Sequence, residues 1–260
     1  NTLDIKLFGA IEICWHGNLL TNFRSQKALV LLAYLICENR PLTREYLAGL
    51  GWPDMNAAQA LGLLRRSLHV LNQQLPGCLD IDRRTVHFRP TVPVTLDIHR
   101  FASYVAQAEV NAWARAAVLY RASFLQGIYL DDAPELESWL HQEQDRWQQQ
   151  VVEVLNRLIR HYTAHAAYSQ ALHYIRQWLS IEPWQEAAHY QSMLLLARGG
   201  HISTALAQYE HCRQILWAEL GVEPALETEA LYARIQAMRL IPPANLPVTT
   251  TPFIGREEEC

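Results

Sequence analysis

Residues 56–75, Asn-Ala-Ala-Gln-Ala-Leu-Gly-Leu-Leu-Arg-Arg-Ser-Leu-His-Val-Leu-Asn-Gln-Gln-Leu, form the stretch around which the chain is organised. Leucines recur along it at steps of three and four residues, namely Leu61, Leu64, Leu68, Leu71 and Leu75. This spacing is typical of the apolar face of an amphipathic helix. Asn56 is suited to cap the first turn, and Gln59, three places on, completes a capping box. The sequence therefore predicts a helix over 56–75 whose leucine face is buried.

The side of this helix that faces away from the leucines is polar. At about 100° per residue, it carries Gln59, Gly62, Arg66, His69 and Gln73, with Leu63, Arg65 and Val70 at its margins. In the major groove of DNA, arginine pairs with guanine and glutamine with adenine. A helix that reads base edges and an ordinary solvated surface helix both fit this face. The neighbouring elements favour the first.

The elements around this helix follow the order of a winged helix-turn-helix. In chain order we expect strands at 3–8 and 11–15, helices at about 24–38, 43–51 and 56–75, and strands at 78–83 and 85–89. In such a fold the third helix enters the major groove, while the hairpin, or wing, lies along phosphates or in the minor groove. Arg83, Arg84 and Arg89 fall in the predicted hairpin. An arginine-rich turn alone is usually a solubilising loop, so the wing assignment depends on the helix before it.

From Leu96 onward the pattern is helical. The predicted helices are at about 97–109, 111–122, 134–163, 168–180, 184–198, 201–219 and 225–238. Ala171-Leu172 and Ala205-Leu206 stand 34 residues apart, which is the period of tetratricopeptide helix pairs. Stacked helix pairs form curved surfaces suited to protein contacts. We expect the tryptophans of this part to lie in the core and between helices, namely Trp147, Trp178, Trp184 and Trp217.

The predicted fold class is mainly α with a small β part. We expect a winged helix-turn-helix domain at 1–95, an all-helical tetratricopeptide-like domain at 96–240, and a linker with the start of a truncated domain at 241–260. Residues 1–95 hold ten basic and seven acidic residues, a net of +3, whereas the remainder holds twelve and nineteen, a net of −7. Such asymmetry is typical of a nucleic-acid module joined to a protein-interaction module.

Composition narrows the class of protein further. The five cysteines are scattered and form no C-x-x-C pair, which predicts reduced thiols in the cytoplasm, with neither a disulfide framework nor a zinc site. Apolar runs fall short of the roughly 20 residues that cross a membrane, and the N-terminus shows no signal peptide. We therefore expect a cytoplasmic protein that does not bind membranes.

Several motifs then resemble one family, over about residues 3–238 and in the family's order. They are Trp52-Pro53-Asp54, Ala60-Leu61, Leu64-Arg65-Arg66-Ser67-Leu68, Leu96-Asp97-Ile98-His99-Arg100-Phe101, Leu119-Tyr120-Arg121, Phe124-Leu125, Glu137-Ser138-Trp139, Glu182-Pro183 and Glu219-Leu220-Gly221-Val222-Glu223-Pro224. Up to residue 68 they resemble the OmpR-like DNA-binding domain of SARP-type transcriptional activators. The later motifs resemble that family's bacterial transcriptional activator domain.

The resemblance implies sequence-specific binding to double-stranded promoter DNA. It further implies side-by-side copies on direct repeats, with the helical domain contacting a neighbouring copy or RNA polymerase. Residues that match the family's recognition surface or shape its fit are Gln59, Gly62, Leu63, Arg65, Arg66, Ser67 and His69. By the helical geometry, Arg66 and His69 are the better base readers, and Arg65 suits a phosphate. Three residues at predicted helix starts are candidates for contacts to the DNA backbone, although each could equally be an ordinary surface residue: Lys27, Thr43 and Arg44.

The end of the chain carries a second resemblance. Residues 241–252 are proline-rich without periodicity and are predicted to be a linker. Phe253-Ile254-Gly255-Arg256-Glu257-Glu258 resembles the start of the nucleotide-binding domain in activators of the STAND ATPase type. A glycine-rich phosphate loop, G-x-x-x-x-G-K-[ST], does not occur in the sequence. We therefore expect an N-terminal fragment of a larger regulator that binds no cofactor itself.

Catalysis is the main rival class, and the sequence argues against it. His161 and His165 share a helix face but lack a third ligand nearby, so no metal site is predicted. Ser67 and His69, two residues apart on a helix, do not face each other as a catalytic pair would. We predict no catalytic residues. The remaining alternative is a protein–protein interaction module in which the winged helix contacts a protein partner.

Overall fold

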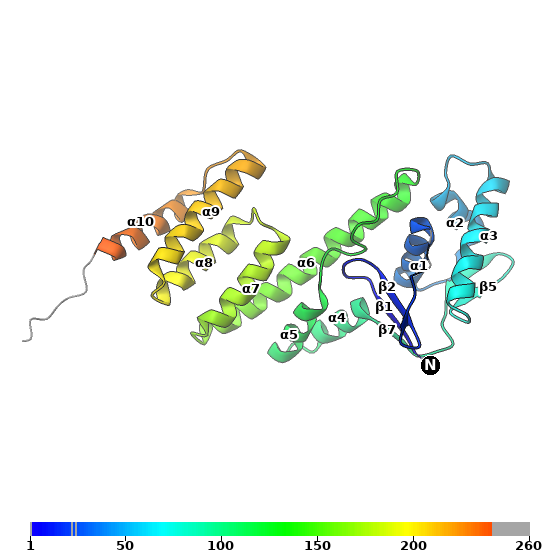
Figure 1. The fold of residues 1–260 in the computed structure, drawn as a ribbon, viewed down its shortest axis with the longest axis horizontal. Helices are drawn as coiled ribbons and strands as arrows, with labels where there is room; N and C mark the ends of the chain where they lie inside the picture. Colours follow the sequence, from blue (N-terminus) through cyan, green and yellow to red (C-terminus); the bar gives the residue numbers. More distant parts are fainter. Residues whose placement is uncertain (1, 22, 24, 241–260) are drawn as a thin grey trace, which may run out of the picture. The chain divides into compact units, whose positions relative to one another are not determined.

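The computed structural model describes residues 2–21, 23 and 25–240, which divide into two compact units, Asn1–Ile181 and Glu182–Cys260 (Figure 1). The division falls inside the predicted helical domain. The predicted domain boundaries after residues 95 and 240 therefore stay predictions. The predicted linker and truncated domain at 241–260 lie outside the described residues.

The first unit begins with a four-stranded sheet in the order β3-β2-β1-β7. β1 (Leu3–Lys6), β2 (Glu12–Trp15) and β3 (Asn18–Leu19) form the antiparallel sheet expected from their alternating pattern. β7 (Val94–Leu96) pairs with β1 in parallel, with Ile5 opposite Leu96. The sequence did not predict this strand. It brings the end of the first ninety-odd residues back beside their start.

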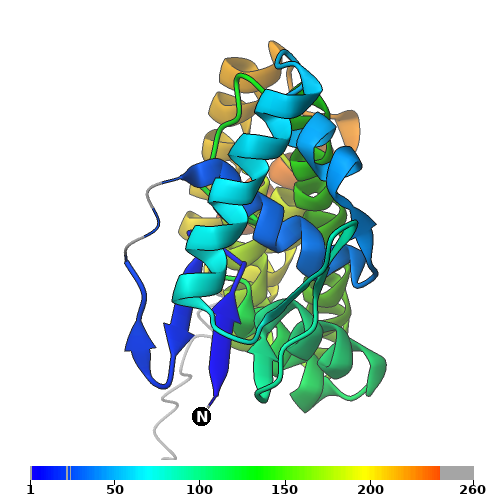
Figure 2. The same ribbon diagram turned by 90° about the vertical axis from the view of Figure 1, so that its right-hand side faces the viewer.

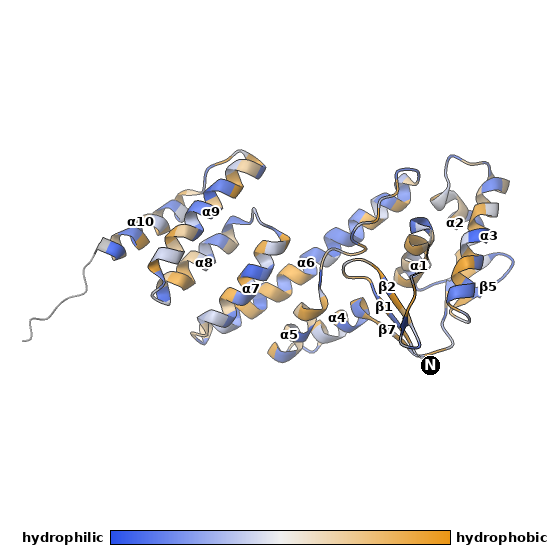
Figure 3. Ribbon diagram, viewed as in Figure 1, coloured by the Kyte–Doolittle hydropathy of each residue, from blue (hydrophilic) through white to orange (hydrophobic). Residues whose placement is uncertain are grey.

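Three helices and a second sheet complete the winged helix-turn-helix. The helices are α1 (Gln26–Glu38), α2 (Arg44–Gly51) and α3 (Ala57–Gln74), and the sheet has the order β4-β6-β5, with β4 (Leu42–Thr43), β5 (Leu79–Ile81) and β6 (Thr85–Phe88). α1 is apolar along most of its length (Figure 3) and nearly all of it is buried. Each helix begins at a side-chain cap, Ser25, Thr43 or Asn56. The predicted elements are confirmed, with small changes at their ends.

Four further helices belong to the first unit: α4 (Asp97–Ala106), α5 (Val110–Leu119), α6 (Pro134–Ala164) and α7 (Tyr168–Ile181). α4 packs against β1 and β7 and α6 against α2, whereas α5 packs on α4 and α6, and α7 on α6. α5 stops before the predicted residue 122, because the chain turns at Tyr120 and Phe124 bridges to Phe8 and Gly9. The Phe8 ring makes edge-to-face contacts with Phe101, Tyr120 and Trp147, at centroid distances of 5.6, 5.3 and 5.4 Å. One aromatic cluster therefore joins β1 to α4 and α6.

Asp97 makes the second connection between the strands and the helices. Its buried carboxylate accepts hydrogen bonds from the backbone N–H groups of Leu7, Phe8 and Ile98, at 2.8–2.9 Å. Burial raises the pKa of this carboxyl group, and the N–H donors oppose that rise. The first residue of α4 thus satisfies the backbone where the chain leaves β1.

The second unit contains α8 (Glu186–Arg198), α9 (Ile202–Leu220) and α10 (Leu226–Leu240) around a core of Met193, Ala205, Tyr209, Leu231 and Ile235. The predicted 34-residue repeat is confirmed, since α7 and α9 begin at Tyr168 and Ile202 and Ala171 and Ala205 are both fully buried.

The tryptophan prediction holds only in part. Trp147 and Trp178 are buried, as expected, but Trp184 and Trp217 are 43% and 62% exposed. Trp184 lies before the first turn of α8 and Trp217 near the end of α9, positions that the unit's core does not cover.

The second unit also buries one imidazole. His189 is 1% exposed, with Nε2 2.8 Å from the Pro183 carbonyl oxygen and Nδ1 2.6 Å from the Gln208 side-chain amide nitrogen. A neutral ring satisfies both contacts, donating from Nε2 and accepting at Nδ1. Burial lowers the pKa of His189 below its ordinary value of 6.5.

This burial predicts a pH dependence of stability. Below pH 6.5 the unfolded state binds the His189 proton more readily than the folded state does, so the free energy of unfolding falls as the pH falls toward the lowered pKa. We expect the urea midpoint, followed by circular dichroism, to drop between pH 7.5 and 5.5. The drop should be smaller in His189→Gln, which cannot bind that proton. An equal drop in both proteins would contradict this assignment.

Candidate nucleic-acid interface

The buried face of α3 fixes which of its side chains point outward. Ala60, Leu64, Leu68 and Leu71 are buried, and Asn56 accepts a hydrogen bond from the Gln59 N–H at 3.0 Å. Leu61, expected in the buried stripe, is only half-buried, and Ala60 takes its place. The small alanine lets the first turn of α3 pack closely, with Leu61 at the edge of the contact.

The outward side of α3 carries the candidate residues of this helix, which we call the reading face: Gln59, Gly62, Leu63, Arg65, Arg66, Ser67 and His69. Among them Gln59, Arg65, Arg66 and His69 are exposed, and Gly62, Leu63 and Ser67 are half-buried. A Cβ atom added to Gly62 would meet nothing within 4 Å, so the surface there is open. Figure 2 shows α3 at the front of the first unit, with no other element in front of it.

A groove runs along one edge of the reading face. It has a volume of about 340 Å³ and lies between α3 and the start of α1. Its lining residues are Phe23, Ser25, Ala28, Arg66, Ser67, Val70, Gln73 and Gln74. The sequence placed Val70 and Gln73 on or near the outward face but did not bring them against α1, because no local pattern links residues 23–28 to α3.

The wing is the hairpin of β5 and β6, and its tip is organised by Asp82. The Asp82 carboxylate accepts hydrogen bonds from the backbone N–H groups of Arg84 and Thr85 at 2.6 and 2.5 Å, and from the Thr85 hydroxyl at 3.0 Å. These bonds hold the pKa of Asp82 below its ordinary value. The tip therefore stays ordered around a charged carboxylate while Arg83 and Arg84 remain exposed.

The start of α2 lies against the wing tip. β4 pairs with β6, so that Thr43 is opposite Thr85. The Arg44 N–H donates to the Arg84 carbonyl at 2.8 Å, and the Arg44 guanidinium donates to the Asp82 carbonyl at 3.2 Å. We call Arg44, Arg83 and Arg84 the basic corner. The positive end of the α2 dipole adds to its charge.

Three further sequence candidates are held by contacts within the protein. The Thr43 hydroxyl caps α2 by accepting from the Tyr46 N–H at 3.3 Å, so its oxygen is already used. Arg89 lies at the base of the hairpin, bonded to the Cys78 carbonyl, and not at the tip. Lys27 is buried, and its Nζ lies 2.8 Å from Asp132 and over the Trp52 ring. The expectation that Lys27 contacts the DNA backbone is therefore wrong.

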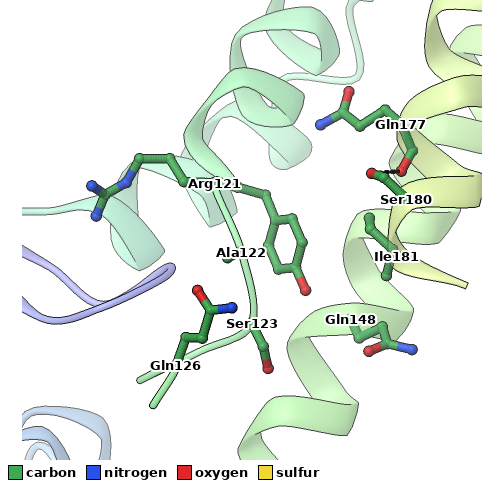
Figure 4. Close-up of a pocket in the computed structure, with 9 residues that line it drawn as sticks. Arg121, Ala122, Ser123, Gln126, Gln148, Gln177, Ser180 and Ile181 are labelled. Carbon is green, nitrogen blue, oxygen red and sulfur yellow. Dashed lines mark hydrogen bonds between the residues drawn. The ribbon is translucent and has the colours of Figure 1, made fainter.

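Two other groups of polar side chains are weaker candidates for a binding site. The Nδ1 atom of His165 bonds to the His161 carbonyl at 2.8 Å, and the described residues contain no group of three or more metal-ligating side chains. A cavity of about 530 Å³ between the 120–126 loop, α6 and α7 is lined by neutral amides and hydroxyls, including Gln126, Gln148 and Ser180 (Figure 4). Arg121 points away from it toward the strands, where it pairs with Glu12.

Among the described residues, none of the helices has both the length and the apolar character needed to cross a membrane.

Comparison with known proteins identifies the family. Residues 96–236, from α4 into α10, match the family described as bacterial transcriptional activator domain. The chain belongs to this family. Membership in the bacterial transcriptional activator domain family places it among bacterial transcriptional regulators and confirms the resemblance drawn from the motifs that begin at Leu96.

Similarity to known proteins also covers the winged helix. The regulatory proteins AfsR of Streptomyces coelicolor and of Streptomyces griseus are each 26% identical to 98% of the chain. The chain spans 28% of the length of either relative. Mycobacterium tuberculosis EmbR, solved in complex with a low affinity phosphopeptide, has the same fold, with a TM-score of 0.63 and 19% identity over 91% of this chain and 65% of that chain. The predicted fold class is thereby confirmed.

Proposed function

We propose that the chain is the promoter-reading part of a cytoplasmic transcriptional activator. The reading face of α3 and the wing bind double-stranded promoter DNA sequence-specifically, as side-by-side copies on direct repeats. The helical domain contacts a second copy or RNA polymerase. The observation that carries this proposal is the exposed reading face of α3, on the same fold as an ordered arginine wing.

The side chains divide by role on chemical grounds. Arg66 suits the O6 and N7 acceptors of a guanine, and Gln59 the edge of an adenine. His69 is a further base reader one turn from Arg65, whose guanidinium suits a phosphate. Three residues of the reading face are half-buried and would shape the fit to the groove rather than read bases, namely Gly62, Leu63 and Ser67. With α3 in the major groove, the basic corner and Thr43 would contact the sugar-phosphate backbone that borders this groove.

The helical domain supports a role in protein contacts. Trp217 and Leu226 are 62% and 80% exposed, and both lie near the turn between α9 and α10. Exposed aromatic and aliphatic side chains of this kind are typical of partner-binding surfaces. A neighbouring copy and RNA polymerase are the partners that the family resemblance implies.

The first test is a selection from random duplex DNA with the native chain and with Arg66→Ala. We expect a repeated motif, and in Arg66→Ala a loss of about 1–3 kcal/mol in binding with relaxed preference at one base position. Arg160→Ala, in α6 with its side chain 73% exposed, is the matched control and should bind like the native chain.

Other outcomes separate the alternatives. If Arg66→Ala keeps both affinity and preference, the assignment of α3 as the reading helix is wrong. Binding without any selected motif would contradict sequence-specific reading by this chain and would indicate that RNA polymerase is needed for it. No binding at all would favour the alternative, in which the winged helix contacts a protein.

Arg84→Ala is expected to weaken binding to every sequence alike. Its guanidinium is exposed at the wing tip, whereas its backbone groups bond to Asp82 and Arg44 and survive the substitution. Loss of one phosphate contact should flatten the slope of log K against log salt by about 0.9. The measurement is a salt series on the selected motif and on a scrambled duplex, with Arg198→Ala as control. An unchanged slope would remove Arg84 from the interface.

A further inference from the structure

A large, exposed apolar side chain lies at the margin of the reading face of α3. Val70 is 38% exposed and lines the same groove as Arg66, Ser67 and Gln73. It follows Arg66 by four residues, so the two side chains are neighbours along the helix surface. The aliphatic groups of α3 that serve the core lie on its other side, at Leu64, Leu68 and Leu71. Val70 is therefore available to a partner beside Arg66.

The major groove offers one apolar group to such a side chain. Guanine, cytosine and adenine present only donors and acceptors there, whereas thymine also presents its C5 methyl group. Four helical residues span about 6 Å, which is close to two base-pair steps of about 3.4 Å. A valine four residues after an arginine that holds a guanine can therefore reach a thymine within two base pairs of it.

We propose that Val70 is a specificity-determining residue that packs against the C5 methyl of a thymine within two base pairs of the guanine bound by Arg66. The inference rests on the proposed function, since it requires α3 to lie in the major groove. Arg66 sets the guanine by hydrogen bonds, and Val70 distinguishes thymine from the other pyrimidine by an apolar contact. The operator therefore contains this pair of bases in each repeat.

The test uses the full chain and the motif recovered by selection. Each thymine of the motif is replaced in turn by deoxyuridine, which pairs identically and lacks only the methyl group. At one position we expect binding to weaken about fourfold, the effect of one buried methyl group. Val70→Ala should weaken binding to the thymine duplex by a similar factor and should no longer distinguish thymine from deoxyuridine at that position.

Controls make the outcomes distinct. Alanine is a better helix former than valine, so Val70→Ala keeps α3, and circular dichroism verifies this. Val118→Ala, at a valine 79% exposed on α5, should retain the native response to deoxyuridine. If a motif is selected but Val70→Ala responds to every deoxyuridine as the native chain does, this inference is overturned and the proposed function stands. If no motif is selected, both fail.

Discussion

Asp97→Ala is expected to lower the free energy of unfolding of the first unit by about 3–5 kcal/mol. The substitution removes the acceptor of three buried backbone N–H groups, those of Leu7, Phe8 and Ile98. A buried donor left without a partner costs about 1–3 kcal/mol. Two of these donors, Leu7 and Phe8, directly follow β1, so the loss would loosen the chain where it leaves the strand beside α4.

Urea unfolding followed by circular dichroism measures this effect. Asp97→Asn keeps one acceptor oxygen and should fall between Asp97→Ala and the native chain. Asp54→Ala, at an exposed carboxylate in the loop before α3, is the control and should change stability by less than about 0.5 kcal/mol. A loss for Asp97→Ala no larger than that of the control would mean that water replaces the carboxylate.

Phe8→Ala is expected to lower the free energy of unfolding by about 3–5 kcal/mol. The ring is fully buried and contacts Phe101, Tyr120 and Trp147 edge to face, so its removal leaves a cavity lined by three aromatic rings. Trp147 fluorescence should shift as solvent or side chains fill the gap. Phe8→Leu keeps most of the volume and should cost distinctly less. Equal losses for Phe8→Ala and Phe8→Leu would point to the aromatic contacts rather than the volume.

The same contacts bear on the choice of fragments. A fragment that ends at residue 95 lacks Asp97, Phe101 and Trp147, and would expose Phe8 together with the two unpaired N–H groups of Leu7 and Phe8. Residues 1–181 keep the whole of the first unit. DNA binding by the winged helix apart from α8–α10 is therefore best measured on 1–181, since failure of 1–95 would report unfolding.

Much of the fold could be predicted because its signals are local. The leucine spacing of 56–75 and the cap at Asn56 predicted α3 nearly to the residue. The strands of the wing could be predicted from residues 78–83 and 85–89 because their turn is equally local, with Asp82 accepting N–H bonds from two and three residues on. The 34-residue repeat predicted where α7 and α9 begin.

The remaining features depend on contacts between distant parts of the chain. β7 is three residues long and pairs with β1 in parallel, so nothing in its own sequence marks it as a strand. The burial of Lys27 could not be predicted, because its partner, Asp132, lies in the distant turn before α6. Arg44 joined the wing through the two-residue strand β4, which is too short to show a period. The helices and strands of the candidate site could therefore be predicted from the sequence, but the contacts that bring them together could not.

The aromatic cluster around Phe8 leaves no hinge where the winged helix meets α4. If copies bind side by side on direct repeats, as we propose, they would then keep one rotational setting about the duplex axis. A half turn of DNA, about five base pairs, would carry the next copy to the opposite face. The tolerance of an operator to insertions would therefore follow the helical pitch of the DNA, because the protein supplies no twist of its own at this junction.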